Sequence, residues 1–171
     1  DGQMCDAVID RGTLLAIMQA AKKADDSLLR DYAETTVAVA DIKIAVRSMK
    51  TGKNKDFMKR AMAECNTLDI DRLATAAVAG MEEIERYLAD TAYAGGAEAL
   101  SESASAFERW CDNRIIETIK PQKYNPFTVG PIVAYILARL NEIKTVRIIL
   151  TCKLNQLPEE AIRERVREMY V

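Results

Sequence analysis

The sequence contains no histidine and only seven glycines and four prolines among 171 residues. The absence of histidine excludes Ser-His-Asp catalysis, two-histidine zinc sites and the Glu-x-x-His di-iron pattern. The scarcity of glycine and proline, together with a hydrophobic content of 49%, excludes collagen-like and low-complexity chains. The composition therefore indicates a folded protein with one sizeable apolar core.

Excess charge of either sign is also missing. The 24 Lys+Arg and 26 Asp+Glu residues leave a formal net charge of −2, whereas a nucleic-acid binder needs excess basic residues to neutralise phosphates. The longest stretch without a charged residue is 124–138, which is interrupted by Pro126 and Pro131. A membrane-spanning helix needs about 20 apolar residues. We therefore expect no nucleic-acid partner and no direct membrane span.

The four cysteines do not form a metal-binding or redox pattern. They lie far apart in the sequence and none belongs to a Cys-x-x-Cys pair: Cys5, Cys65, Cys111 and Cys152. Three of them have apolar neighbours at helical spacing, which is typical of buried, reduced thiols that behave as small hydrophobic residues. No zinc site and no cofactor are expected.

Apolar residues recur at steps of three and four along most of the chain, and no useful strand alternation occurs. This periodicity predicts an all-α bundle of about eight helices. The first helix is expected to begin at Asp10, and a long second helix should run from Asp25-Asp26 to Lys50 and end before Gly52. Asn54 should begin a third helix that reaches Cys65, and Asp69–Ala79 should form a fourth.

Later breaks are expected at Gly80, at Gly95-Gly96 and in the proline-rich segment 121–131. A long helix should then start near Pro131, with a line of large apolar residues on one face: Ile132, Ile136, Leu140, Ile143 and Leu150. Because other faces of this helix are also apolar, we expect it to be centrally buried. The last helix should start at Pro158 and carry Ile162, Val166 and Met169, surrounded by solvated charges that include Arg167.

Few residues suggest catalysis. The segment Asp25-Asp26-Ser-Leu-Leu-Arg-Asp31 invites comparison with the aspartate-rich magnesium motif that binds diphosphate, but helix capping explains these aspartates more simply. Thr51-Gly52-Lys53 is a helix stop, because no glycine-rich loop precedes it. Glu142 and Arg139 have the spacing of an ordinary exposed ion pair. Arg147 falls on a mostly apolar face, which indicates a contact with another helix or chain.

The sequence from Tyr124 to Val166 contains a recognisable order of motifs. A Phe/Gly/Pro entry is followed by Tyr-x-x-Ala-Arg, Glu-Ile, Val-Arg-Ile-Ile, Lys-Leu-Asn and an acidic-led final helix; these elements are Phe127, Gly130, Pro131, Tyr135, Ala138, Arg139, Glu142, Ile143, Val146, Arg147, Ile148, Ile149, Lys153, Leu154, Asn155, Glu159, Glu160, Ile162 and Arg163. This order resembles the C-terminal signature of the C subunits of archaeal and bacterial V/A-type ATPases, a family related to the d subunit of the eukaryotic V-type enzyme.

Two segments of the chain also resemble each other, which we call the internal echo. A shift of 104 positions matches the segment 41–47 to 144–150 and aligns Ile42 with Val146, Lys43 with Arg147, Ile44 with Ile148 and Val46 with Leu150. Two amphipathic helices can match in this way by chance. Within the family, which contains three helical units arranged as a pseudo-threefold funnel, the echo resembles two copies of a repeated helical unit.

The resemblance implies a non-catalytic central-stalk subunit of a rotary ATPase or ATP synthase. Its partners would be the central-shaft subunits and the membrane rotor ring, between which it would act as a socket. It would be cytoplasmic and peripheral to the membrane. Residues 1–171 would form the all-helical C-terminal part of a longer subunit, with lobes at about 1–66 and 67–171, and such a part could self-associate. No catalytic, cofactor-binding or metal-binding residues are expected, and the candidate interface residues are Glu142, Arg147 and Lys153.

Two alternatives from other classes remain open from the sequence. The first is a stand-alone helical adaptor or scaffold protein unrelated to ATPases, which would not co-purify with shaft or ring subunits. The second is a helical enzyme that uses the Asp25 and Asp26 cluster on a diphosphate substrate, which would show magnesium-dependent turnover.

Overall fold

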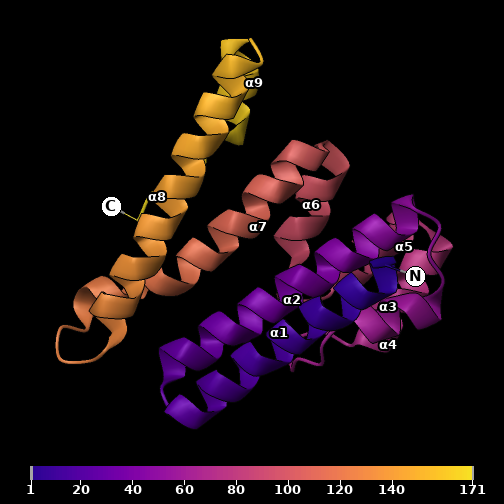
Figure 1. Cartoon of the computed structure of the whole chain (residues 1–171), viewed down its shortest axis with the longest axis horizontal. Coiled ribbons are helices and arrows are strands. Elements are labelled where there is room, and N and C mark those ends of the chain that lie inside the picture. The colour runs from indigo at the N-terminus through magenta and orange to yellow at the C-terminus, as the bar shows by residue number, and fades with distance from the viewer. Residues whose placement is uncertain (1, 171) are drawn as a thin grey trace. The chain divides into compact units, whose positions relative to one another are not determined.

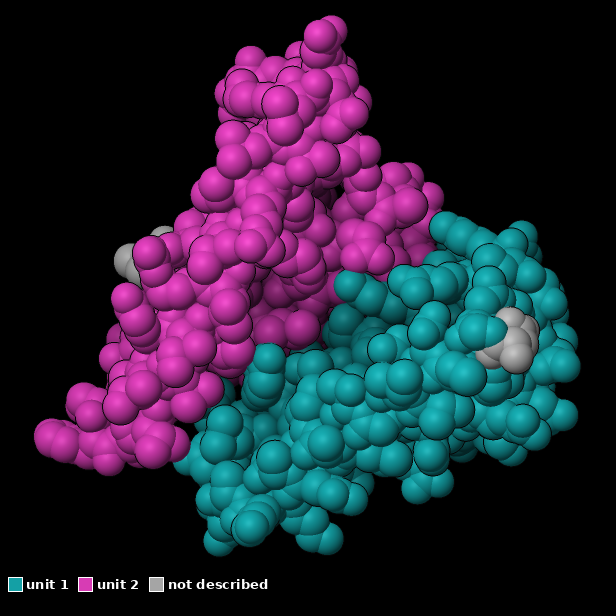
Figure 2. Space-filling model, viewed as in Figure 1, with its two compact units in different colours: residues 1–98 teal, residues 99–171 magenta. Residues whose placement is uncertain are grey.

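The computed structural model describes residues 2–170, and within that range the chain is all-α, as predicted, with nine α-helices, one 3₁₀ helix and no strand. The chain divides into two compact units, unit 1 (Asp1–Glu98) and unit 2 (Ala99–Val171) (Figure 1; Figure 2). None of the helices in the described range is both long and apolar enough to span a membrane.

Unit 1 is built on five helices: α1 (Gly2–Ala24), α2 (Ser27–Lys50), α3 (Lys55–Ala61), α4 (Ile70–Ala79) and α5 (Met81–Ala89). Helix α6 (Ala94–Glu102) contains the boundary between the units. Unit 2 contains α7 (Ala104–Ile119), the 3₁₀ helix η1 (Lys120–Tyr124), α8 (Gly130–Leu154) and α9 (Glu159–Arg165).

Helices α1 and α2 form an antiparallel hairpin (Figure 1). Asp25 lies in the left-handed region, with φ of 51°, and so ends α1, while the carboxylate of Asp26 accepts a hydrogen bond from Leu29 N at 3.1 Å and begins α2. The predicted extent of α2 is confirmed, and Gly52 follows it at φ of 66°. The predicted start of the first helix at Asp10 is wrong, because α1 already begins at Gly2.

The short helices of unit 1 also begin at the expected polar residues. The Asn54 side chain accepts from Phe57 N, and the Asp69 carboxylate accepts from Asp71 N and Arg72 N. Helix α3 nevertheless ends at Ala61 rather than near Cys65, since residues 62–69 leave the helix and pack against α2. Leu73, Ile84 and Leu88 are fully buried, as the apolar spacing of α4 and α5 requires.

The predicted break at Gly95-Gly96 is wrong. Both glycines lie in the first turn of α6. The break between α5 and α6 comes earlier, at residues 90–93, and a further break at Ser103 separates α6 from α7. The hydroxyl of Ser103 accepts a hydrogen bond from Ala106 N at 2.9 Å, which caps α7. Glycine is least favourable in a helix interior, so two glycines in a first turn are compatible with α6.

The compact units divide after Glu98, whereas the sequence suggested lobes that divide after residue 66. The difference arises because α4 and α5 pack on α2, which keeps residues 67–93 with the N-terminal helices. Glu34 on α2 strengthens this connection. Its carboxylate accepts hydrogen bonds from Asn66 N (2.6 Å), Thr67 N (2.7 Å), the Thr67 hydroxyl (2.8 Å) and Asn66 Nδ2 (3.1 Å).

Replacing Glu34 with alanine is expected to lower the free energy of unfolding by about 1–2 kcal/mol, because four donors lose a charged acceptor that water replaces only in part. Urea unfolding followed by circular dichroism measures the change. Glu64→Ala is the matched control, since Glu64 is exposed and its side chain has no hydrogen-bond partner within residues 2–170. Equal stability of the two variants would show that Glu34 does not anchor the 66–67 turn.

Candidate functional site

The most unusual surface of the chain is one face of α8. Its large aliphatic residues are exposed: Ile132 is 66% exposed, Ile136 52%, Ile143 47% and Leu150 55%. At about 100° per residue these four positions fall within about 40° of arc, so they form one continuous stripe. Leu140 and Val146 are exposed beside it. We call these six residues the α8 face.

The opposite side of α8 is buried and is made of small or polar residues. Its members are Gly130, Ala134, Ala138, Asn141, Thr145 and Cys152. Helix α8 packs on α7, η1 and α9 through this side. The expectation that the helix is centrally buried is therefore wrong. Small residues allow a close approach to α7, while the larger aliphatic residues point away from the neighbouring helices of unit 2.

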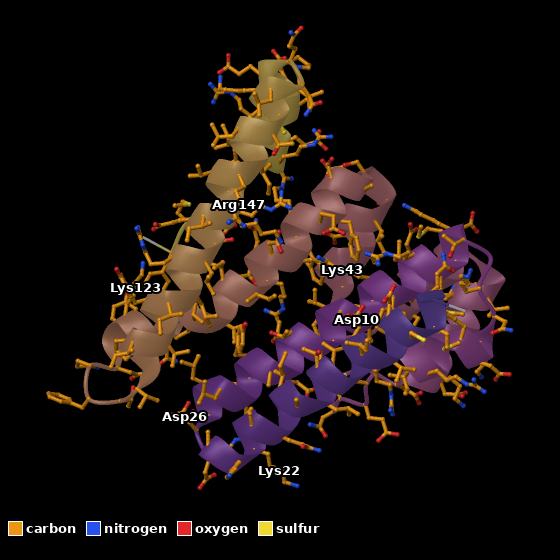
Figure 3. All side chains as sticks on the ribbon, in the orientation of Figure 1. Asp10, Lys22, Asp26, Lys43, Lys123 and Arg147 are labelled. Atoms are coloured by element: carbon orange, nitrogen blue, oxygen red, sulfur yellow. The ribbon has the colours of Figure 1, made fainter. Side chains whose placement is uncertain are left out.

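The three residues expected at an interface lie near the α8 face but differ in their contacts. Glu142 forms the predicted ion pair with Arg139 on its own helix. Arg147 and Lys153 are exposed, and within residues 2–170 neither has an ion-pair or hydrogen-bond partner through its side chain. Arg147 is labelled on α8 in Figure 3. The structure thus brings an apolar stripe together with two cations whose charges are not neutralised.

A polar network that the sequence did not reveal holds α8 from its buried side. Asp112 on α7 accepts hydrogen bonds from Lys144 Nζ at 2.6 Å and from Arg167 Nε at 2.7 Å. The Arg167 side chain is only 6% exposed, so the expectation that it is solvated is wrong. Helix α9 ends at Arg165, and the extended segment that follows carries Arg167 back to α7. A charged residue in a charged run gives no sequence signal of such burial.

The same segment is also fixed by its backbone. Glu168 N donates to Asn113 Oδ1 and Glu168 O accepts from Asn141 Nδ2, both at 2.8 Å, while Lys120 Nζ reaches the Glu168 carboxylate at 2.5 Å. Arg167 and Glu168 therefore connect α7, η1 and α8. This packing uses the buried side of α8, and within residues 2–170 no other helix of unit 2 covers the α8 face.

Unit 1 contains one carboxylate in an unusual environment. Asp41 on α2 is fully buried; its Oδ1 accepts from Ala63 N at 3.1 Å, and its Oδ2 has no hydrogen-bond partner. Burial raises the pKa of Asp41 to about 7, against the hydrogen bond from Ala63 and the attraction of Arg11. Arg11 Nε itself donates to the Met62 carbonyl at 2.8 Å. The carboxylate lies inside the helix packing and not in an open site.

The aspartates considered for diphosphate chemistry have structural partners instead. Asp26 caps α2, and Asp25 forms an ion pair with Arg30 at 2.7 Å. Within residues 2–170 no group of three or more acidic or cysteine residues is placed to hold a metal ion. The four cysteines form no disulfide with one another; Cys111 and Cys152 are buried as expected, Cys65 is half-buried and Cys5 is exposed.

Comparisons with known proteins agree with the resemblance seen in the sequence. The family described as ATP synthase (C/AC39) subunit matches residues 1–165. The C subunit of the A-type ATP synthase of Methanocaldococcus jannaschii is 27% identical over 156 residues, which cover 86% of this chain and 39% of that protein. The chain therefore spans well under half the length of this curated relative. No solved structure matches the chain. With all but its last six residues matched, the chain belongs to the ATP synthase (C/AC39) subunit family.

Proposed function

We propose that the chain is a non-catalytic part of the central stalk of a V/A-type rotary ATPase or ATP synthase. In this role it would act as a socket between the rotating shaft and the membrane ring that carries ions, on the cytoplasmic side and without crossing the bilayer. The observation that carries the proposal is the family match over residues 1–165. Membership of an ATP synthase subunit family also removes the support for an adaptor unrelated to ATPases.

The architecture suits a mechanical role. Helices α2 and α8 contain 24 and 25 residues, so each is about 36–38 Å long. Close-packed helices compress little and transmit strain, which is what passing torque between two bodies requires. The ordinary structural roles of Asp25 and Asp26 support a subunit that takes no part in bond making or breaking.

The test compares two activities of the parent complex. Removal of the subunit is expected to abolish ATP-driven ion transport while ATP hydrolysis by the catalytic part continues, because rotation is then no longer passed to the ring. Adding the subunit back should restore transport. Persistent transport without the subunit, or its failure to co-purify with shaft and ring, would contradict the proposal. An equal loss of hydrolysis and transport would also contradict it.

A further inference from the structure

The α8 face and its two flanking cations form one composite surface. Relative to the stripe of Ile132, Ile136, Ile143 and Leu150, Arg147 lies about 40° to one side, and Lys153 lies about 80° to the other. The two cations are six positions apart, which is about 9 Å along the helix axis. Helix α8 carries one acidic residue, Glu142, which is paired with Arg139. The surface is therefore apolar at its centre and positively charged at both edges.

Unit 1 shows what covers the corresponding face of α2. The shift of 104 positions aligns Val146 with Ile42 and Leu150 with Val46. Ile42 and Val46 are 0% and 6% exposed, whereas Val146 and Leu150 are 54% and 55% exposed. Helix α2 packs against α1, α3, α4 and α5, while the α-helices of unit 2 that pack against α8 are α7 and α9. The sequence-matched positions are thus buried under helices in one unit and left open in the other.

One of the helices that cover α2 is α5, which is both amphipathic and acidic at its start. Helix α5 packs on α2 and has Ile84 and Leu88 on its buried side. Its first turn carries Glu82 and Glu83. It is an acidic amphipathic helix. Lys43, which the shift aligns with Arg147 and which Figure 3 labels on α2, is half-buried in the same unit.

We propose that the α8 face docks an amphipathic helix of another polypeptide, with an apolar stripe flanked by carboxylates that meet Arg147 and Lys153. The apolar stripe supplies area, and the carboxylates neutralise two cations that have no partner within residues 2–170. The inference goes beyond the proposed coupling role, since it names a surface and the chemistry of its partner.

A second copy of α8 is a poorer occupant. In a parallel pair the cations of the two helices would lie together and repel each other. In an antiparallel pair the charged half, 139–154, would face the uncharged half, 130–138, so Arg147 and Lys153 would again lack carboxylates. Charge complementarity thus favours a partner helix that is acidic where α8 is basic.

The test measures binding to the full chain in solution. The probe is a synthetic helical peptide of about 20 residues with a leucine stripe and glutamate on both flanks, and the matched peptide has lysine in place of glutamate. The glutamate peptide is expected to bind. Reversing both charges of the chain with Arg147→Glu and Lys153→Glu should weaken its binding at least about tenfold and should create binding of the lysine peptide.

Controls separate the docking surface from general charge and from folding. Lys22→Glu changes an exposed basic residue of α1 and should leave binding unchanged. Leu150→Ser removes part of the apolar stripe without changing charge. It should therefore weaken the binding of the glutamate peptide to the otherwise unaltered chain and of the lysine peptide to the charge-reversed chain. All substituted residues are exposed, so circular dichroism should show unchanged helicity.

Three results would overturn the proposal: equal binding of the two peptides to the unaltered chain, no binding of either peptide, or self-association that Leu150→Ser abolishes. Binding of anionic phosphatidylglycerol vesicles in place of the glutamate peptide would also overturn it, since the occupant would then be a membrane surface. The coupling role is tested by ion transport in the parent complex, so either idea can fail while the other stands.

Discussion

Replacing Asp41 with asparagine is expected to stabilise unit 1 by about 2 kcal/mol at pH 8 and to remove a loss of stability that the unaltered chain shows between pH 4 and pH 7. Asparagine keeps an oxygen that can accept the hydrogen bond from Ala63 N. It carries no charge in an environment that disfavours one. The amide nitrogen will still lack a good partner, which is why the gain is smaller than the full ionisation penalty.

The direction of the pH effect follows from the raised pKa. Burial raises the pKa of Asp41 from 3.8 to about 7, so between these values the folded chain holds a proton that the unfolded chain has released. The extra stability that the folded chain gains by holding this proton is fully present below pH 3.8. It falls as the pH rises to about 7 and is absent above it. At about 1.4 kcal/mol per pH unit the loss reaches roughly 4 kcal/mol. Cys65 does not offset it, because burial raises the pKa of its thiol to about 11 and keeps it neutral.

Urea unfolding across pH 4 to 8, followed by circular dichroism, measures this difference. The variant Asp31→Asn is the control, since Asp31 is exposed on the same helix and should not change the profile. The informative quantity is the difference between variant and unaltered chain at each pH, because other carboxylates titrate in both. Parallel profiles for Asp41→Asn and the unaltered chain would mean that Asp41 has an ordinary pKa.

Local features of the fold were predictable because they depend on residues close in sequence. Asp26, Asn54 and Asp69 cap helices where expected, and Gly52 follows α2 with positive φ. Each cap accepts a hydrogen bond from a backbone N–H group a few residues away, and the glycine adopts a positive φ at its own position. The break expected at Gly95-Gly96 falls slightly earlier, at residues 90–93, and the two glycines belong to the first turn of α6.

The surroundings of the candidate surface were less predictable because they depend on distant residues. The spacing of Ile132, Ile136 and Ile143 correctly placed them on one face, and the Arg139–Glu142 pair was readable from its separation of three. The periodicity of apolar residues predicts only that one face of α8 is apolar. Whether the face meets a helix or solvent is decided by the rest of the fold. The burial of Arg167 likewise depends on Asp112, which lies 55 positions earlier.

Replacing Asp112 with alanine is expected to lower the free energy of unfolding of unit 2 by about 3–5 kcal/mol. The substitution leaves Arg167, whose side chain is 6% exposed, without its carboxylate, and it removes the acceptor of Lys144 on α8. This destabilisation comes from leaving the charge of Arg167 buried without a partner. It is larger than the net contribution of the intact ion pair to stability. Trp110, the single tryptophan, lies on α7 two residues before Asp112, so its fluorescence reports the unfolding of this unit in urea.

Two further variants separate this cause from a general loss of contacts. Arg163→Ala breaks an ion pair with Glu159 whose side chains are 76% and 73% exposed, and it should change stability by less than about 0.5 kcal/mol. The double variant Asp112→Leu with Arg167→Met removes both members of the buried pair and should recover most of the stability that Asp112→Ala loses, since no charge is then left buried. A double variant no more stable than Asp112→Ala would show that the pair contributes through its geometry, holding residues 166–169 against α7 and α8, and that the unpaired charge is not what destabilises the single variant.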